Sequence, residues 1–109
     1  MARNSGPGSG DTVRLVAVEE EQFRRSLLRA WVISSAGFKV RIADPSTIEY
    51  VDRLGSLRIE GEDSFADRAV NFTLFTQSVP DDNARPRQQV LDNVARAFAH
   101  AGWGLRFDR

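Results

Sequence analysis

Residues 84–109, ARPRQQVLDNVARAFAHAGWGLRFDR, carry the clearest structural pattern in this chain of 109 residues. At the helical repeat of about 100° per residue, the apolar side chains between Val90 and Ala101 fall on one side and the polar ones on the other. Pro86 fits the first turn, where its missing N–H costs nothing, and Gly102 fits the left-handed position that ends a helix. The pattern predicts an amphipathic helix that lies against a sheet.

The residues on either side of this helix indicate how it begins and which element comes after it. Asp82 or Asn83 is expected to cap its start by accepting an N–H that has no partner within the helix. Beyond Gly102 the apolar residues alternate with Gly104, Arg106 and Asp108, which is the period of a half-buried strand. Those apolar residues are Trp103, Leu105 and Phe107.

The junction at Gly102 has an earlier counterpart. Residues 36–42 and 101–107 both read Ala-Gly-aromatic-x-aliphatic-Arg-apolar. Shared chemistry of a helix-to-strand junction is the simpler explanation, and an internal duplication is the alternative. A helix is expected over Glu19–Ala36, because a stripe of mostly apolar residues shares one face at helical spacing: Phe23, Leu27, Ala30, Trp31 and Ser34. The alternative is a strand at Trp31–Ile33 that turns at Ser35–Gly37, because these apolar residues also favour strands.

A β-hairpin is predicted from Thr47–Asp52 and Ser56–Gly61. Its loop gives a self-consistent register in which Ile48 faces Ile59, Tyr50 faces Leu57 and Glu49 faces Arg58. A shift of one residue would destroy all three matches, so the register is well specified.

The remaining segments complete the expected fold. Strands are expected at Thr12–Val18, Phe38–Ala43 and Arg68–Thr76, and a polar loop at Glu62–Asp67. The predicted fold is therefore α+β in the order β-α-β-β-β-β-α-β, with two helices packed on one face of a mostly antiparallel sheet. Residues 12–109 are expected to form the single domain, and residues 1–11, rich in Gly, Ser and Pro, a disordered lead or an expression remnant.

Composition limits the chemistry and the partners. The chain has no Cys, and its 15 basic and 15 acidic residues balance. Disulfides and thiolate metal sites are excluded, and the balance argues against nucleic acid or an anionic membrane as a partner. We expect neither a signal peptide nor a membrane span, because no long apolar run is found, and we therefore expect a cytoplasmic location. The only His, His100, falls on the polar side of the last helix, and nothing pairs it with a nucleophile. We expect no enzymatic activity, no cofactor and no metal.

The charges are distributed unevenly along the chain. Residues 41–67 hold seven acidic residues against three arginines, a local net charge of −4. A glycosidase dyad of Glu60 and Glu62 is disfavoured because no sugar platform is implied. A hard-cation site of Glu62, Asp63 and Asp67 is disfavoured because the spacing of a calcium loop is absent. An acidic face that binds a protein partner is the preferred hypothesis. Its candidate contact residues are Glu60, Glu62, Asp63 and Asp67.

The second half of the chain also carries a recognisable order of pieces. They are a strand with Tyr (47–50), a strand ending in Gly-Glu (57–62), an aromatic strand (72–75), a polar loop with Pro80, and a helix closing on Gly-Trp (87–103). In this order the stretch from about Ile48 resembles a family of small bacterial immunity proteins from polymorphic toxin systems. That family has a Trp followed by Pro residues after the aromatic strand, whereas this chain has Gln77-Ser78-Val79-Pro80.

The resemblance implies a non-catalytic cytoplasmic protein, which binds and neutralises a cognate toxin. A basic toxin domain would be steered to an acidic face by charge complementarity. The rival hypothesis is a small structural or regulatory module that self-associates through an open sheet edge. The sequence leaves a monomer and a homodimer equally open.

Overall fold

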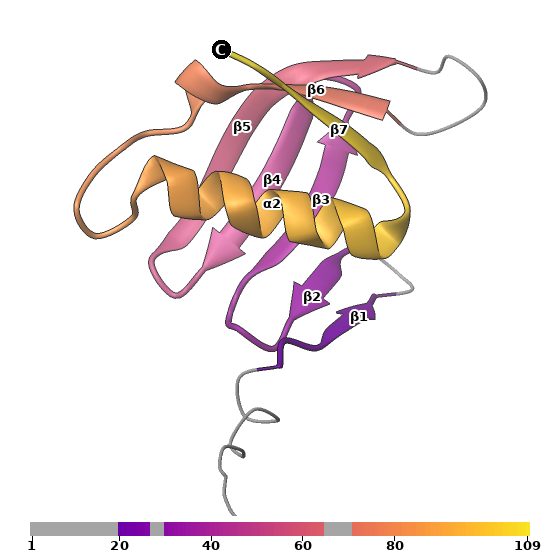
Figure 1. Cartoon of the computed structure of the whole chain (residues 1–109), viewed down its shortest axis with the longest axis vertical. Helices are drawn as coiled ribbons and strands as arrows, with labels where there is room; N and C mark the ends of the chain where they lie inside the picture. Colours follow the sequence, from indigo (N-terminus) through magenta and orange to yellow (C-terminus); the bar gives the residue numbers. More distant parts are fainter. Residues whose placement is uncertain (1–19, 27–29, 65–70) are drawn as a thin grey trace, which may run out of the picture.

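A computed structural model describes residues 20–26, 30–64 and 71–109. The described part is a seven-stranded mixed sheet, with one α-helix lying across one face (Figure 1). We call the face that the helix covers the inner face and the opposite one the outer face. Element labels follow Figure 1. The strands are β1 (Phe23–Arg25), β2 (Val32–Ser34), β3 (Lys39–Asp44), β4 (Thr47–Asp52), β5 (Gly55–Ser64), β6 (Asn71–Phe75) and β7 (Gly104–Asp108).

The strands follow one another in space in the order of the sequence, from β1 to β7. The first six pair antiparallel as a meander, and the sheet curls at β5 (Figure 1). This ten-residue strand pairs with β4 through residues 55–60 and with β6 through residues 61–64. Gly61 stands at the change of partner, and a Cβ there would collide with the carbonyl oxygen of Thr73 and the ring of Phe72. The close approach of β5 and β6 therefore requires glycine.

The predicted hairpin of β4 and β5 is confirmed in its register. Ile48 pairs with Ile59, Tyr50 with Leu57 and Glu49 with Arg58. The turn closes at Gly55, whose φ of 116° lies outside the range that side chains favour. The second strand runs three residues further than expected, to Ser64, so the first three residues of the predicted polar loop lie in the strand, and the rest of that loop lies outside the described residues.

The closing unit forms as predicted, with a different start. The helix α2 spans Arg87–Ala101 and ends at Gly102, which has a φ of 78°. Pro86 occupies the N-cap position, so neither Asp82 nor Asn83 caps the helix. Asp81 accepts the N–H of Arg87 at 3.0 Å instead.

The strand β7 pairs parallel with β6, which gives the sheet its mixed character. A parallel partner can be reached only by a crossover, and a short 3-10 helix η2 (Thr76–Ser78), a polar loop and α2 form that crossover. The crossover places α2 on the inner face.

The core lies between α2 and the inner face. The helix contributes Val90, Leu91, Val94, Ala97 and Phe98, and the sheet contributes Val32, Val40, Ile48, Tyr50, Ile59, Phe72 and Leu74. Each is at most 2% exposed. The alternation of these residues with polar ones along each strand specifies which face of the strand turns inward.

The predicted helix over Glu19–Ala36 is wrong, and its alternative is confirmed. The segment contains β1 and β2, and β2 turns through Ser35–Gly37 into β3. Val32 and Ile33 are β-branched, and a strand lets Val32 point into the core while Ile33 stays half-buried on the outer face. Phe23 reaches the same core from β1, opposite Ser34. A hairpin therefore buries the apolar stripe that had suggested a helix.

The predicted α+β fold needs correction as a whole. The described residues hold one α-helix in place of two, and the sheet is a curled mixed sheet in place of a mostly antiparallel one. The predicted strand Thr12–Val18 and the expected disordered lead at 1–11 lie outside the described residues. So do residues 68–70, which begin the strand predicted at Arg68–Thr76; from Asn71 to Phe75 that strand forms.

Candidate protein-binding surface

Two of the four candidate contact residues stand together on the outer face. Glu60 and Glu62 are both exposed, and they alternate along β5 with the buried Ile59 and Gly61. Since α2 packs on the side of Ile59, the two carboxylates point away from the helix. Residues two apart on a strand share one face, which is the orientation expected from their spacing.

The other two candidates do not join them. Asp63 pairs with Phe72 across the strands, so it faces the inner side and is half-buried. Its Oδ1 is buried and has no hydrogen-bond partner among the described residues. Asp67 lies outside the described residues. The structure therefore assembles a pair of carboxylates, and it separates Asp63 from that pair.

Ion pairing reduces the acidic surface further. Three acids of the segment are paired: Asp44 with Arg58 at 3.8 Å, Glu49 with Arg41 at 2.7 Å and Asp52 with Arg85 at 2.5 Å. Within the described residues, neither Glu60 nor Glu62 has a cation within ion-pair distance. The acids of residues 41–67 that remain outside these ion pairs in the described part of the chain are Glu60 and Glu62 on the outer face and Asp63 on the inner side.

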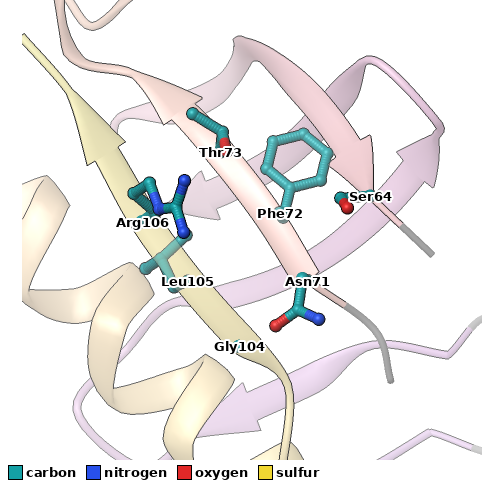
Figure 2. A pocket seen from close by; sticks show the side chains of 7 residues that line it. All are labelled: Ser64, Asn71, Phe72, Thr73, Gly104, Leu105 and Arg106. Carbon is teal, nitrogen blue, oxygen red and sulfur yellow. The ribbon is translucent and has the colours of Figure 1, made fainter. Parts of the chain in front are cut away.

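A pocket of about 360 Å³ opens between the end of β5, β6 and the start of β7 (Figure 2). Its described lining is Ser64, Asn71, Phe72, Thr73, Gly104, Leu105 and Arg106. Thr73 lies between Glu62 on one neighbouring strand and Arg106 on the other, so both charges border this part of the outer face. Arg106 is the only charged group in that described lining, and Glu62 is the cross-strand neighbour of Thr73. The described lining offers hydroxyl, amide and guanidinium groups for hydrogen bonding.

A chain of polar side chains crosses from α2 to the sheet on the inner side. Asn93 donates to the hydroxyl of Tyr50 at 3.0 Å, and Arg96 donates to the amide oxygen of Asn93 at 2.5 Å. Arg96 also binds Glu21 at 2.7 Å, and Glu21 accepts a hydrogen bond from Ser34. These contacts satisfy polar groups at the helix–sheet interface, where an unpaired group would be costly.

An ion pair lies near Tyr50 at the hairpin turn. Asp52, two residues along the strand from Tyr50, is bound by Arg85 through Nη2 at 2.5 Å and Nε at 3.2 Å. Burial raises the pKa of Tyr50 above its usual value. Burial also opposes the ionisation of Asp52, but Arg85 and the N–H of Leu54 outweigh it and lower the pKa of that carboxyl. Tyr50 therefore stays protonated and Asp52 stays charged at neutral pH.

A second pocket, of about 320 Å³, lies above this ion pair. Tyr50, Asp52 and Asn93 line it, and Phe38 and Leu54 form part of its rim. Leu54 is 49% exposed and is the one exposed large apolar side chain among the described residues. Because Tyr50 binds Asn93 and Asp52 binds Arg85, we assign these groups a structural role.

The described residues bring together no three His, Asp or Glu side chains that could hold a metal ion. The helix α2 is neither long nor apolar enough to cross a membrane. No protein-family model, curated protein sequence or solved structure matches this chain.

The sequence did not predict the series of hydrogen-bonded polar side chains between α2 and the sheet. The partners lie far apart in the sequence; Glu21 and Arg96, for example, are 75 residues apart. The available signal was Asn93, a polar residue one position from the apolar stripe of the helix. Asn93 is only 7% exposed. A buried polar side chain requires a partner, and Tyr50 is the partner that the fold provides.

Proposed function

We infer that this chain is a non-catalytic binding protein, which acts in the cytoplasm by holding a basic protein partner against the outer face at β5. The observation that carries the proposal is the pair Glu60 and Glu62, exposed side by side and outside every ion pair of the described residues. Free carboxylates on one face attract a cationic surface and raise the rate of encounter.

The shape of this face supports the same function. In the described part of the chain the helix packs on the inner face only, so the outer face of β5 offers extended strands to a partner. Thr73 and Arg106 continue the polar surface next to Glu62: the hydroxyl of Thr73 can accept or donate a hydrogen bond, and the guanidinium of Arg106 can donate to a carboxylate of the partner. Such a mixed rim around a few charges is common at protein interfaces.

The resemblance to immunity proteins suggests which partner this is. We propose a toxin domain encoded beside this chain, with a basic surface that the chain covers and blocks. The described residues contribute no nucleophile–base pair to such an interaction, and the proposal requires none. Neutralisation would follow from occlusion alone.

The experiment compares two double variants against the protein encoded by the neighbouring gene. Glu60→Lys/Glu62→Lys reverses the proposed contacts, and Glu20→Lys/Asp92→Lys makes the same change of charge at exposed residues elsewhere. We expect the first to weaken binding on the order of a hundredfold and abolish protection of cells that express the neighbouring protein, by replacing attraction with repulsion. The second should bind like wild type.

Calorimetry at two salt concentrations completes the design, because contacts between exposed charges weaken as salt is raised. Equal binding by the two double variants would refute the acidic contact surface. Absence of any binding to the neighbouring protein would refute the immunity function itself. The two outcomes are therefore distinguishable.

A further inference from the structure

The two edge strands of the sheet differ in length. The strand order begins at β1 and finishes at β7, so each has one edge with no neighbour among the described strands. β1 spans three residues and β7 spans five. An edge strand presents unpaired N–H and C=O groups, and these groups can pair with a strand of another chain.

The charges of β7 make this edge complementary to itself. Arg106 and Asp108 are exposed on the outer face, and Phe107 lies between them and faces inward. In an antiparallel pair of two β7 strands centred on Phe107, Arg106 of each copy stands opposite Asp108 of the other. Opposite charges at facing positions of antiparallel strands stabilise the pair.

The charges at the edge of β1 are not complementary to themselves. Its central residue is Arg24, followed by Arg25, and both are exposed. Self-pairing centred on Arg24 would place two arginines directly opposite each other, which is unfavourable. Pairing of two copies would therefore bring opposite charges together at β7 and like charges together at β1.

We propose that β7 is a self-association edge, at which two copies of this chain pair antiparallel about a two-fold axis through Phe107. The two Phe107 rings meet on the inner side, where each is already covered by Arg109 at 5.7 Å from its centroid. On the outer side the contact holds two reciprocal pairs of Arg106 and Asp108. The same residues of both copies form the interface, as a two-fold axis requires.

The geometry of this pairing has a consequence for the outer face. A two-fold axis perpendicular to the joined sheet keeps the outer faces of both copies on one side of it. The carboxylates Glu60 and Glu62 of the two copies then share one surface. The dimer does not depend on the proposed partner, and it can be tested on the purified chain alone.

The test is analytical ultracentrifugation of the purified chain over a range of concentrations. Five-residue strands form a small interface, so we expect a weak dimer whose fraction rises with concentration. Arg106→Asp turns both cross-strand pairs into like-charge pairs, and so does Asp108→Arg. Each single variant should dimerise on the order of tenfold more weakly than wild type.

Two further samples make the test specific to this register. The double variant Arg106→Asp/Asp108→Arg restores opposite charges at every facing position and should dimerise like wild type. An equimolar mixture of the two single variants should form a heterodimer more readily than either variant forms a homodimer. The contribution of net charge alone to these effects is separated by a control variant with the same change of charge at the other edge.

Arg24→Asp is the matched control, because it makes the same charge change at an exposed residue of the opposite edge. It should leave the dimerisation constant unchanged. A chain that stays monomeric up to about 1 mM would overturn the proposal. So would a wild-type dimerisation constant for Arg106→Asp, or an equal loss for Arg24→Asp.

Discussion

Two junctions of this chain share one sequence pattern and join different elements. Residues 36–42 connect the strand β2 to β3, whereas residues 101–107 connect the helix α2 to β7. In both, the glycine has a positive φ, 99° at Gly37 and 78° at Gly102. Each of these glycines also donates its N–H to the carbonyl three residues before it, at 3.2 Å.

The strands that follow the two glycines are oriented alike. Val40 and Leu105 point inward, while Arg41 and Arg106 at the next position point outward. The pattern therefore specifies how the chain leaves the turn and which side chains face the core.

The next hydrogen bond distinguishes the two junctions. The N–H of Trp103 donates to Phe98 in the last turn of the helix, whereas the carbonyl of Phe38 accepts from Ser34 across the hairpin, each at 2.9 Å. Before the second glycine the chain reads Ala-Phe-Ala-His-Ala, which favours a helix, and before the first it reads Val-Ile-Ser-Ser-Ala, with two β-branched residues. The shared pattern determines the exit from the turn, and the preceding residues determine the element that enters it.

The largest effect is expected at the aromatic residue of each junction, where burial differs. Phe38 is 5% exposed and stacks on Tyr50, with ring centroids 5.8 Å apart, whereas Trp103 is half-buried at the edge of Phe98. Phe38→Ala should lower the free energy of unfolding by about 3–5 kcal/mol, and Trp103→Ala by about 2 kcal/mol. Urea unfolding followed by circular dichroism measures both.

Phe38→Leu is the control, because it keeps most of the buried apolar volume and should cost less than half as much as Phe38→Ala. Equal losses for the two alanine variants would show that the junctions contribute equally to the core. The two junctions would then differ only in their hydrogen bonds.

A smaller effect concerns the ion pair beside the first junction. Arg85 and the N–H of Leu54 lower the pKa of Asp52 against the opposing effect of its burial. A carboxyl with a lowered pKa in the folded state adds stability above its unfolded pKa, near pH 4, and that stability is lost as pH falls through the folded value. Asp52→Asn should therefore cost about 1–3 kcal/mol at pH 7 and much less near pH 2.

Urea unfolding at both pH values checks this dependence, with Glu62→Gln as the control for the removal of one negative charge from an exposed site. If Asp52→Asn costs the same at both pH values, its effect comes from packing and not from the charge. The second junction has no such carboxylate among the described residues that contact Trp103; there the charged neighbour is Arg25, 5.0 Å from the ring centroid.

Much of the fold could be predicted from the sequence where the pattern is local. The hairpin register of Tyr50 with Leu57 was specified by facing side chains, and α2 and β7 by their periodicity and by Gly102. The first helix was wrong because the stripe from Phe23 to Ser34 satisfies two structures. Only the position of β3, opposite β2, decides between them.

The candidate surface was predictable in part, for a similar reason. Glu60 and Glu62 share a face because strand geometry requires it, and no distant contact is needed to show this. The ion pair that removes Asp52 from the acidic surface involves Arg85, 33 residues away, and no local pattern brings them together. Contacts between residues that are distant in the sequence could therefore not be predicted, either at this surface or among the polar side chains between α2 and the sheet.

The smallest expected effect tests the shared glycine itself. A Cβ at Gly37 or at Gly102 would meet nothing within 4 Å, so alanine there costs only backbone strain. We expect about 1 kcal/mol for each, and more for Gly37, because its φ of 99° lies further from the left-handed minimum near 57° than the 78° of Gly102. Gly102→Asn should recover part of the loss, since asparagine tolerates this conformation at a helix end. Urea unfolding of the two alanine variants measures the loss of stability at each glycine. A larger loss at Gly102 than at Gly37 would mean that the helix end, and not the turn conformation, determines the cost.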